Sequence, residues 1–594
     1  MRHWILGGLI AIGLAFPVTA QQAADAVQPE QGTASGVVDG SPEIAAALDA
    51  RSRGVPVEAS DWMISAANPL AVEAGAAVLR AGGSAADAMI AVQTVLGLVE
   101  PQSSGLGGGA FLVWYDGSEG TITTLDGRET APLAATPTLF QNDAGEPLDF
   151  FDAVVGGRSV GTPGTPALLE DAHRRWGRSP WPGLFDRAIE LADQGFAVSP
   201  RLAGLIGWDA ERLASHPATA AYFLPDGAPL QAGQSLRNPA YADTLRALAS
   251  GGAAAFYGGA IAADIVSAVG RADNPGVLSP VDLAIYELRE RPAVCAAYRV
   301  FDVCGMGPPS SGAMTVGQIL GMLEPFDLAA MGPDNSESWR LIGDASRLAF
   351  ADRGRYMADS DYVPVPVKGL VDADYLRDRA QLLTGDDALP EVAPGAPNFD
   401  HALNWADDEA IEFPSTSHIS IVDSYGNVLS MTTTIENVFG SRVMVRGFLL
   451  NNELTDFSFR SHRDGVPIAN RLEPGKRPRS SMAPTIVMKD GKPVLAIGSP
   501  GGSRIIGYVA QAIIAWADWG MDVQQAVSMG HAVNRFGTFD LEAGSPAEAL
   551  QGDLAAMGYE VSVRDLNSGL HAIEIGATLK GGADPRREGI ALGE

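Results

Sequence analysis

Three hydroxyl residues in a row, Ser415, Thr416 and Ser417, lie in an alternating stretch, PSTSHISIVD, at residues 414–423. A threonine hydroxyl is a poor nucleophile unless a base lies beside it. If the bond between Ser415 and Thr416 is cut, Thr416 gains its own α-amino group, whose ordinary pKa is about 8. That amine can accept the hydroxyl proton. The stretch therefore fits either an ordinary strand threonine or a nucleophile that becomes a new N-terminus.

A β-hairpin is predicted to position this threonine. The segments STSHISIVD and VLSMTTTI flank a turn, SYGN. A three-residue loop, 424–426, with glycine in the left-handed conformation would pair Asp423 with Asn427. The same register places Thr416 opposite Thr434, with about 5 Å between their Cβ atoms, so the two hydroxyls could form a hydrogen bond. A four-residue loop would shift the register by one residue.

The segment before the hairpin, residues 384–414, is acidic, rich in proline and weakly periodic. This composition predicts an exposed, mobile linker. A mobile segment that runs into a strand suits a processing site, because the released end must be able to move away.

His418, two residues after Thr416, resembles a general base in position, but we expect it to have a structural role.

Helical and strand patterns alternate along the rest of the chain. Ser84 and Asp87 predict a capping box at the start of a helix. The SSGLGGG that follows this helix precedes a strand, AFLVWYDG. A dinucleotide-binding motif needs a strand before it and a helix after it, so we interpret the glycines as a turn into a buried strand. Residues 160–380 are mostly helical in pattern, and a second hairpin is predicted around Asp490 and Gly491.

The N-terminus has the pattern of a secretory signal. Arg2 and His3 precede a twelve-residue apolar stretch, 5–16, and we place the cut after Ala20, which makes 1–20 the signal peptide. An uncleaved membrane anchor is the alternative. Residues 21–58 show no sustained period and predict a flexible leader. The protein is therefore expected to be periplasmic or secreted, without a membrane anchor once the signal is removed.

Charge and cysteine content limit the classes of function. The chain of 594 residues has 41 basic and 71 acidic side chains, a net charge of −30. Such a surface repels phosphate backbones, which argues against nucleic-acid binding. An exported protein meets an oxidising compartment, so Cys295 and Cys304 could form a disulfide. Two buried free thiols fit the sequence nearly as well.

Six stretches make the sequence resemble the γ-glutamyltransferase (γ-glutamyltranspeptidase) family of N-terminal-nucleophile hydrolases. They occur in the family's order, and the likeness extends from about residue 60 to the end. The resemblance implies an α/β fold, the four-layer α-β-β-α sandwich. It also implies self-cleavage into a large subunit, 59–415, and a small subunit, 416–594, which pair as a heterodimer in one catalytic domain. The stretches are PQSSGLGGG, LDGRETAP, STSHISIVDSYGNVLSMTTTIENVFGS, GFLLNNELTDFS, KRPRSSMAPTIV and GSPGGSRII.

The resemblance further implies a role for each candidate site residue. Thr416 would be the nucleophile and would cut its own precursor, and Thr434 would hydrogen-bond it. Gly501 and Gly502 would donate backbone N–H groups to the oxyanion, where glycine allows close approach. The substrate-binding residues would be Arg128, for the α-carboxylate of the donor, Ser480 and Ser481 as further donors, and Glu436, Glu453 and Asp456 around its ammonium group. Some family members have asparagine in place of Glu436 and glutamine in place of Glu453.

The implied reaction is acyl transfer without a metal or an organic cofactor. Thr416 would attack a γ-glutamyl amide, with glutathione as the expected donor, and the γ-glutamyl group would pass to water, an amino acid or a peptide. The span 457–479 is short and lacks a tyrosine, so we expect no closed lid and a more open site. Alternatives are a glutaryl-type acylase or a γ-polyglutamate depolymerase of the same family. A third is an uncleaved, non-catalytic binding protein.

Overall fold

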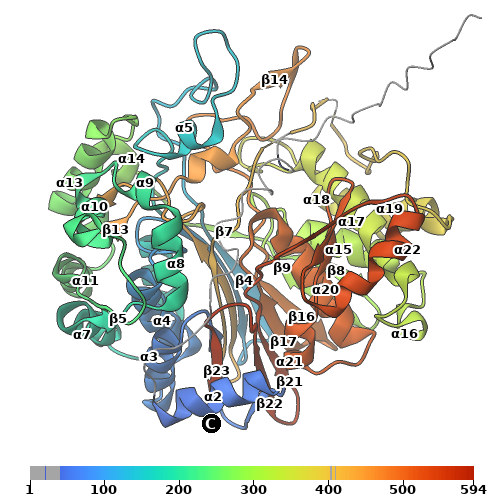
Figure 1. The fold of residues 1–594 in the computed structure, drawn as a ribbon, viewed down its shortest axis with the longest axis horizontal. Coiled ribbons are helices and arrows are strands. Elements are labelled where there is room, and N and C mark those ends of the chain that lie inside the picture. The colour runs from blue at the N-terminus through green and yellow to red at the C-terminus, as the bar shows by residue number, and fades with distance from the viewer. Residues whose placement is uncertain (1–20, 22–40, 402–403, 409) are drawn as a thin grey trace, which may run out of the picture.

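The computed structural model describes residues 21, 41–401, 404–408 and 410–594. Two seven-stranded antiparallel sheets lie face to face in the middle of the molecule, and helices cover both outer faces (Figure 1). The nucleophile sheet, which contains the predicted hairpin, has the order β23-β2-β10-β11-β3-β4-β7. Its strands are β2 (Met63–Ala66), β3 (Gly109–Asp116), β4 (Thr121–Gly127), β7 (Arg289–Arg291), β10 (Ser417–Val422), β11 (Val428–Thr434) and β23 (Ile590–Gly593).

The companion sheet has the order β1-β22-β21-β17-β16-β9-β8. It is made of β1 (Val57–Ala59), β8 (Val294–Tyr298), β9 (Phe301–Gly305), β16 (Thr485–Lys489), β17 (Lys492–Gly498), β21 (His571–Ile575) and β22 (Leu579–Ala583). Both sheets combine strands from before and after residue 416. Neither part of the chain could therefore complete a sheet alone.

The two helical layers differ in their origin along the chain. The layer on the nucleophile sheet comes from the first half: α3 (Pro69–Arg80), α4 (Ala85–Val99), α6 (Thr165–Trp176), α7 (Asp186–Gln194), α8 (Pro200–Trp208), α11 (Pro239–Gly251) and α13 (Gly259–Arg271). The layer on the companion sheet is α15 (Gly312–Leu323), α17 (Ser336–Tyr356), α19 (Ala373–Ala380), α20 (Ile505–Ala517) and α21 (Val523–Ser528).

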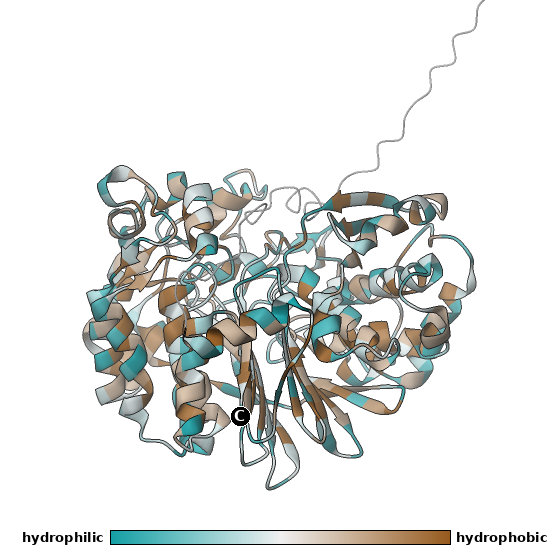
Figure 2. Cartoon of the chain, turned by 60° about the horizontal axis from the view of Figure 1, so that its bottom comes forward, coloured by the Kyte–Doolittle hydropathy of each residue, from teal (hydrophilic) through white to brown (hydrophobic). Residues whose placement is uncertain are grey.

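The alternation of side chains in β10 shows how the layers are held. Ile419 and Ile421 pack into the core beneath the helices, whereas Val422 belongs to the separate core between the two sheets. Ser420 points the same way as Val422 and donates to the carbonyl of His571 in the companion sheet at 3.1 Å. Successive strand residues point to opposite faces, so both faces of β10 are buried. Figure 2 shows the hydrophobic residues concentrated in these central strands.

Several local predictions are confirmed. Asp423 pairs with Asn427 through a backbone hydrogen bond of 3.1 Å, and Gly426 has a φ of 83°, as the three-residue loop requires. The capping box of Ser84 and Asp87 is present at the start of α4. The glycine-rich turn leads into β3, and the second hairpin is formed by β16 and β17.

Two predictions of irregular structure are wrong in part. Within the leader, α2 (Pro42–Ser52) is a helix, N-capped by Ser41, and it buries Ile44 against the core. Residues 1–20 and 22–40 lie outside the described residues. The linker has no helix or strand in its described part after residue 384, yet it is not all exposed, because Trp405, Glu412 and Phe413 are buried. These side chains pack against the folded body, which composition cannot reveal.

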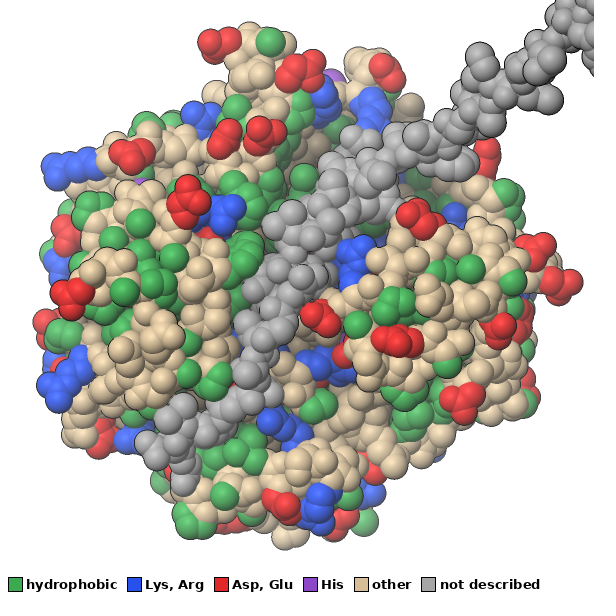
Figure 3. All heavy atoms as spheres, in the orientation of Figure 1, with side chains coloured by type: hydrophobic (Ala, Val, Ile, Leu, Met, Phe, Trp, Pro, Cys, Tyr) green, Lys and Arg blue, Asp and Glu red, His purple; other side chains and the backbone are tan. Residues whose placement is uncertain are grey.

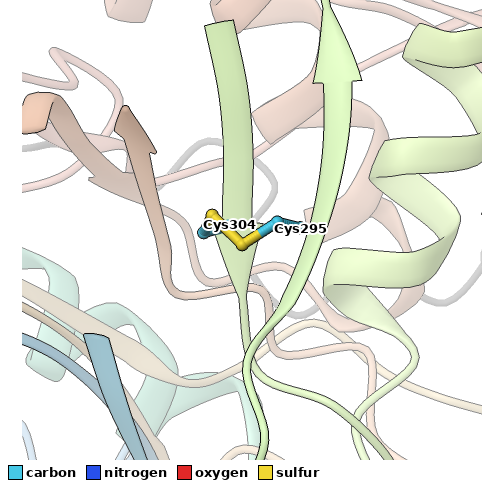
Figure 4. Close-up of a disulfide and its surroundings, with 2 residues drawn as sticks. All are labelled: Cys295 and Cys304. Atoms are coloured by element: carbon cyan, nitrogen blue, oxygen red, sulfur yellow. A yellow bond between two sulfur atoms is a disulfide. The ribbon is translucent and has the colours of Figure 1, made fainter. Parts of the chain in front are cut away.

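Cys295 and Cys304 form a disulfide across neighbouring strands β8 and β9 (Figure 4). No helix in the described part of the chain is long and apolar enough to cross a membrane. On the face shown in Figure 3, acidic and basic side chains are interspersed and do not form one large patch of a single sign.

Candidate active site

The hydroxyls of Thr416 and Thr434 lie 3.0 Å apart, as the hairpin register predicts. Thr416 directly precedes β10 and Thr434 ends β11. The Thr434 hydroxyl oxygen accepts a hydrogen bond of 2.8 Å from the backbone N–H of Glu436. Its own proton therefore remains available for the Thr416 oxygen. Both threonines are buried, with 5% and 2% of their surfaces exposed.

The peptide bond before Thr416 is held by contacts on both sides. Its carbonyl oxygen, on Ser415, accepts a hydrogen bond of 3.2 Å from the N–H of Gly501. The carbonyl of Thr416 accepts one of 3.2 Å from Arg587 Nη1. Thr416 has a φ of 89°, a conformation that costs a residue with a side chain about 1–3 kcal/mol. Cutting the bond would remove this constraint, because the φ angle of Thr416 would no longer exist.

The two glycines after Pro500 adopt conformations that favour glycine. Gly501 has a φ of 136° and Gly502 a φ of 58°. A Cβ atom on Gly502 would lie 2.7 Å from the carbonyl oxygen of Phe413. The chain before Thr416 therefore passes directly over Gly502, and a larger residue there would push it away.

Arg128 and the predicted carboxylates form one buried cluster. Arg128 follows β4, and its guanidinium pairs with Glu453 through Nη1 and with Asp456 through Nη2. Both acids come from one short turn, the 3-10 helix η4 (Glu453–Asp456). Glu436 accepts a hydrogen bond from the side-chain amide of Asn452. The predicted residues thus lie together in one cluster. Arg128, however, contacts the acids that were expected to surround the ammonium group of the donor.

The predicted serines have different partners. Ser480 Oγ accepts a hydrogen bond of 3.1 Å from the N–H of Met482. Ser481 Oγ donates to the carboxylate of Glu412 and accepts a bond of 2.7 Å from Arg353 Nη2. Ser481 therefore already contacts a carboxylate and a guanidinium in the uncleaved chain.

These residues surround a cavity of about 20 Å³. Of the ten predicted site residues, nine line it and Gly501 lies next to it in the chain. In the uncleaved chain Glu412 and Phe413 help to line the cavity, so the expectation of an open site without a lid from residues 457–479 stays a prediction for the cleaved protein. The lining residues are Arg128, Glu412, Phe413, Thr416, Thr434, Glu436, Glu453, Asp456, Ser480, Ser481, Met482, Gly502 and Ile505.

A model of the gamma-glutamyltranspeptidase family matches residues 71–594. The chain belongs to this family. It is 38% identical over 547 residues to the glutathione hydrolase proenzyme of Bacillus subtilis (strain 168), covering 90% of this chain and 91% of that protein. It is 34% identical over 550 residues to the acylase ACY 1 proenzyme of Pseudomonas sp. (strain SE83), covering 90% and 94%. The cephalosporin acylase of Bacillus halodurans has a similar solved structure, with a TM-score of 0.81, 25% identity and coverage of 91% and 97%. The predicted family and fold class are confirmed.

Burial favours the neutral, protonated form of the acids in the site. It raises the pKa of Glu436 and Asp456 well above the ordinary carboxyl range, and neighbouring carboxylates add to the rise for Glu436. The pKa of Glu453 is also raised by burial, although Arg128 opposes the rise. A fourth acid, Glu129, is also buried and lies 4.0 Å from Arg128, and burial raises its pKa as well. The cluster therefore has four buried acids around one guanidinium, and a further cation would stabilise their charged forms.

His418 contacts neither Thr416 nor Thr434. Its ring nitrogens lie 2.9 Å from the Thr432 hydroxyl and 3.1 Å from the Ser420 hydroxyl. Burial lowers its pKa well below the ordinary value, so the ring is neutral and bonded within the space between the sheets. These contacts agree with a structural role.

Sequence reasoning missed Glu412, Phe413 and Arg353. Arg353 lies near the C-terminal end of α17, 59 residues before Glu412, and carries no recognisable local motif. Glu412 lies in a stretch whose composition predicts exposure. Only the folded chain brings the two together beside Thr416.

Proposed function

We propose that the chain is a self-processing γ-glutamyltransferase and glutathione hydrolase with Thr416 as its nucleophile. The observation that carries this proposal is the arrangement around one peptide bond. A hydrogen-bonded threonine hydroxyl follows the bond, and a glycine N–H contacts its carbonyl oxygen. Such a donor stabilises the negative charge that develops on this oxygen during attack.

Self-cleavage would use this arrangement first. The Thr416 hydroxyl oxygen bonds to the carbonyl carbon of Ser415, and its proton passes to water or to a neighbouring group. The bond between that carbon and the Thr416 nitrogen then breaks, and the nitrogen leaves as an amine after taking up a proton. Water hydrolyses the resulting ester and frees the Ser415 carboxylate. Both the hydroxyl and the new α-amine of Thr416 remain in the site.

Turnover would repeat the same chemistry on a substrate. The Thr416 amine, with an ordinary pKa of about 8, takes the hydroxyl proton as the oxygen attacks the γ-amide carbonyl of the donor. The N–H groups of Gly501 and Gly502 receive the oxyanion, and the amine of the donor leaves with a proton. Water, an amino acid or a peptide then takes the γ-glutamyl group from the threonine.

The acid cluster supports a γ-glutamyl donor over a glutaryl donor. A glutamyl group carries an α-ammonium, which Glu436, Glu453 and Asp456 can receive. A glutaryl group has no ammonium, and its binding would leave the pKa values of these buried acids raised. Glutathione is the donor that we propose, by similarity to the hydrolase relatives, whereas an acylase activity is the alternative suggested by the acylase relatives.

We further propose that the protein is exported, with the signal removed after Ala20, and acts in the periplasm or outside the cell. Cleavage would yield a large subunit, 59–415 with its leader, and a small subunit, 416–594. The interleaving of strands from both parts in each sheet supports a heterodimer that remains one catalytic domain.

Mass spectrometry of the purified protein under denaturing conditions tests the proposal. We expect two fragments, the smaller beginning at Thr416, together with hydrolysis of γ-glutamyl-p-nitroanilide. Thr416→Ala should give one uncut, inactive chain. The matched control is Ser417→Ala, because the Ser417 hydroxyl points instead toward Glu100, at 3.3 Å; it should be cut and active. An intact wild-type chain would favour the binding-protein alternative.

A further inference from the structure

A fully buried arginine outside the predicted site contacts the backbone of the proposed nucleophile. Arg587 has 0% of its surface exposed, and its Nη1 donates to the carbonyl oxygen of Thr416 at 3.2 Å. Its Nη2 donates to Asn567, to the backbone oxygen at 3.3 Å and to the side-chain Oδ1 at 3.1 Å. These hydrogen bonds hold the guanidinium in a fixed position beside the residue that reacts.

The pairing of three strands explains how this arginine reaches Thr416. β2 lies between β10 and β23, and its Ala66 is opposite Ile419 on one side and Ile590 on the other. Both neighbours run antiparallel to β2, so the residues that precede each of them extend past the same end of β2. Thr416 comes three residues before Ile419, and Arg587 comes three residues before Ile590. The two residues therefore meet beyond the end of β2.

Two further contacts hold the turn that carries Arg587. Arg51 Nη1, from the helix α2, donates to the backbone carbonyl of Arg587 at 2.9 Å and also to that of Gly589. A Cβ atom on Gly569 would lie 2.8 Å from Arg587 Cδ and 2.7 Å from Pro500 Cγ, so a larger residue would push both away. The turn is therefore fastened by α2 and packed closely against the loop at Gly569.

The contact between Arg587 and Thr416 does not depend on the peptide bond that is proposed to be cut. The carbonyl that Arg587 contacts lies on the C-terminal side of Thr416, and both residues belong to the proposed small subunit, 416–594. Cleavage would alter only the other side of Thr416, where a new α-amine appears. The amine and the carbonyl oxygen of one residue are three bonds apart, so the amine would lie within roughly 7 Å of the guanidinium nitrogen.

The positive charge of Arg587 would favour the neutral form of the Thr416 amine, because a nearby like charge disfavours the ammonium. A neutral amine can accept the hydroxyl proton, whereas an ammonium cannot. Arg587 already acts in this way on a neighbouring base. Burial lowers the pKa of His571 to about 3, Asp584 opposes this shift, and the charge of Arg587 adds to it.

The acids that face Thr416 from the surrounding elements have raised pKa values or arginine partners. Burial raises the pKa of Glu129, Glu436 and Asp456 well above the ordinary carboxyl range, which favours their uncharged forms at neutral pH. The other acids form ion pairs: Glu100 with Arg201, Glu412 with Arg353, and Glu453 with Arg128. Their negative charges are therefore largely balanced, and they oppose the effect of Arg587 only weakly.

We propose that Arg587 is a positioning residue that orients Thr416 through its carbonyl and keeps the new α-amine in its neutral, proton-accepting form. The amine takes the hydroxyl proton as the threonine oxygen attacks, becomes an ammonium, and passes the proton to the leaving amine of the donor. The guanidinium disfavours the ammonium, so it helps the amine to be neutral before attack and to release the proton afterwards. This inference rests on the proposed self-processing function.

The pH dependence of kcat/KM for γ-glutamyl-p-nitroanilide tests the inference. Arg587→Met removes the charge and keeps a long side chain. We expect the acidic limb of the profile to move up by about one pH unit, so that kcat/KM on this limb falls about tenfold, with a smaller change on the alkaline plateau. Arg587→Lys keeps the charge but loses the fork, and it should leave the limb near its wild-type position.

The matched control is Arg442→Met. Arg442 is equally buried and pairs with Asp209 at 2.8 Å, so its loss should destabilise the protein without moving the acidic limb. An equal loss of activity at every pH with Arg587→Met would overturn the inference, because Arg587 would then only stabilise the fold. A limb that moves equally in Arg587→Met and Arg587→Lys would overturn it too. A wild-type protein that is neither cut nor active would instead overturn the proposed function.

A second measurement covers variants that fail to fold or to be cut, because it uses the cleaved wild-type protein. Competitive acetylation over a range of pH, with the peptide that begins at Thr416 quantified by mass spectrometry, titrates this amine directly. We expect a pKa about one unit below the ordinary value of about 8 in the native enzyme, and the ordinary value in concentrated urea. A native pKa at or above the ordinary value would overturn the inference.

Discussion

The hydroxyl of Thr434 is the direct partner of the proposed nucleophile. It contacts Thr416 at 3.0 Å and is oriented by the N–H of Glu436. This geometry lets Thr434 donate its proton to the Thr416 oxygen. The contact exists before any cut, so it can serve both self-cleavage and turnover.

Thr434→Val should slow both processes, because valine keeps the shape and removes the hydroxyl. Loss of one such hydrogen bond costs about 1–3 kcal/mol, roughly tenfold to a hundredfold in rate. The time course of fragment appearance and kcat for γ-glutamyl-p-nitroanilide measure the two effects. The neighbouring Thr433, whose hydroxyl has no hydrogen-bond partner among the described residues, provides the control Thr433→Val. Equal rates for the two variants would show that the Thr434 hydroxyl has no role.

For the helices and strands, the sequence correctly predicted the features that depend on residues close together in the chain. The register of β10 and β11 follows from one glycine, Gly426, in a three-residue loop, and the capping box from Ser84 and Asp87. The burial of Glu412 could not be predicted in this way. It depends on Arg353 and Ser481, which lie far away in the sequence, and the acidic, proline-rich composition around Glu412 suggests solvent exposure. Long-range ion pairs leave no local pattern.

The sequence left open whether Cys295 and Cys304 are bonded or free, and the structure shows a disulfide between them that joins β8 and β9. β8 is the edge strand of the companion sheet, so it has one neighbouring strand to hold it. Replacing both Cys295 and Cys304 by serine should destabilise this edge locally by about 2–4 kcal/mol, because the crosslink limits the unfolded chain. Hydrogen exchange of β8 amides should accelerate, with γ-glutamyl hydrolysis unchanged. Adding a reductant to the wild type should have the same effect and should not affect the double variant. Free thiols in the untreated wild type would contradict this prediction.

Over the whole molecule, the proposed cut divides the chain but not the fold. In the nucleophile sheet, β10 and β11 lie between β2 and β3, which precede the cut. In the companion sheet, β22 pairs with β1 and β16 with β9. β23 also pairs with β2, so the two parts can separate only if these five strand pairings break together with the cores that they enclose.

We therefore expect the two fragments to remain together after cleavage until the protein unfolds. In size-exclusion chromatography under native conditions they should co-elute, at the volume of the uncut Thr416→Ala chain, and they should separate in concentrated urea. A small fragment, 416–594, expressed alone should not fold, because β10 and β11 would lack a strand on either side and leave backbone groups and apolar faces uncovered. A small fragment that elutes alone from the native enzyme would contradict this expectation, since it would mean that each half can complete its sheets without the other.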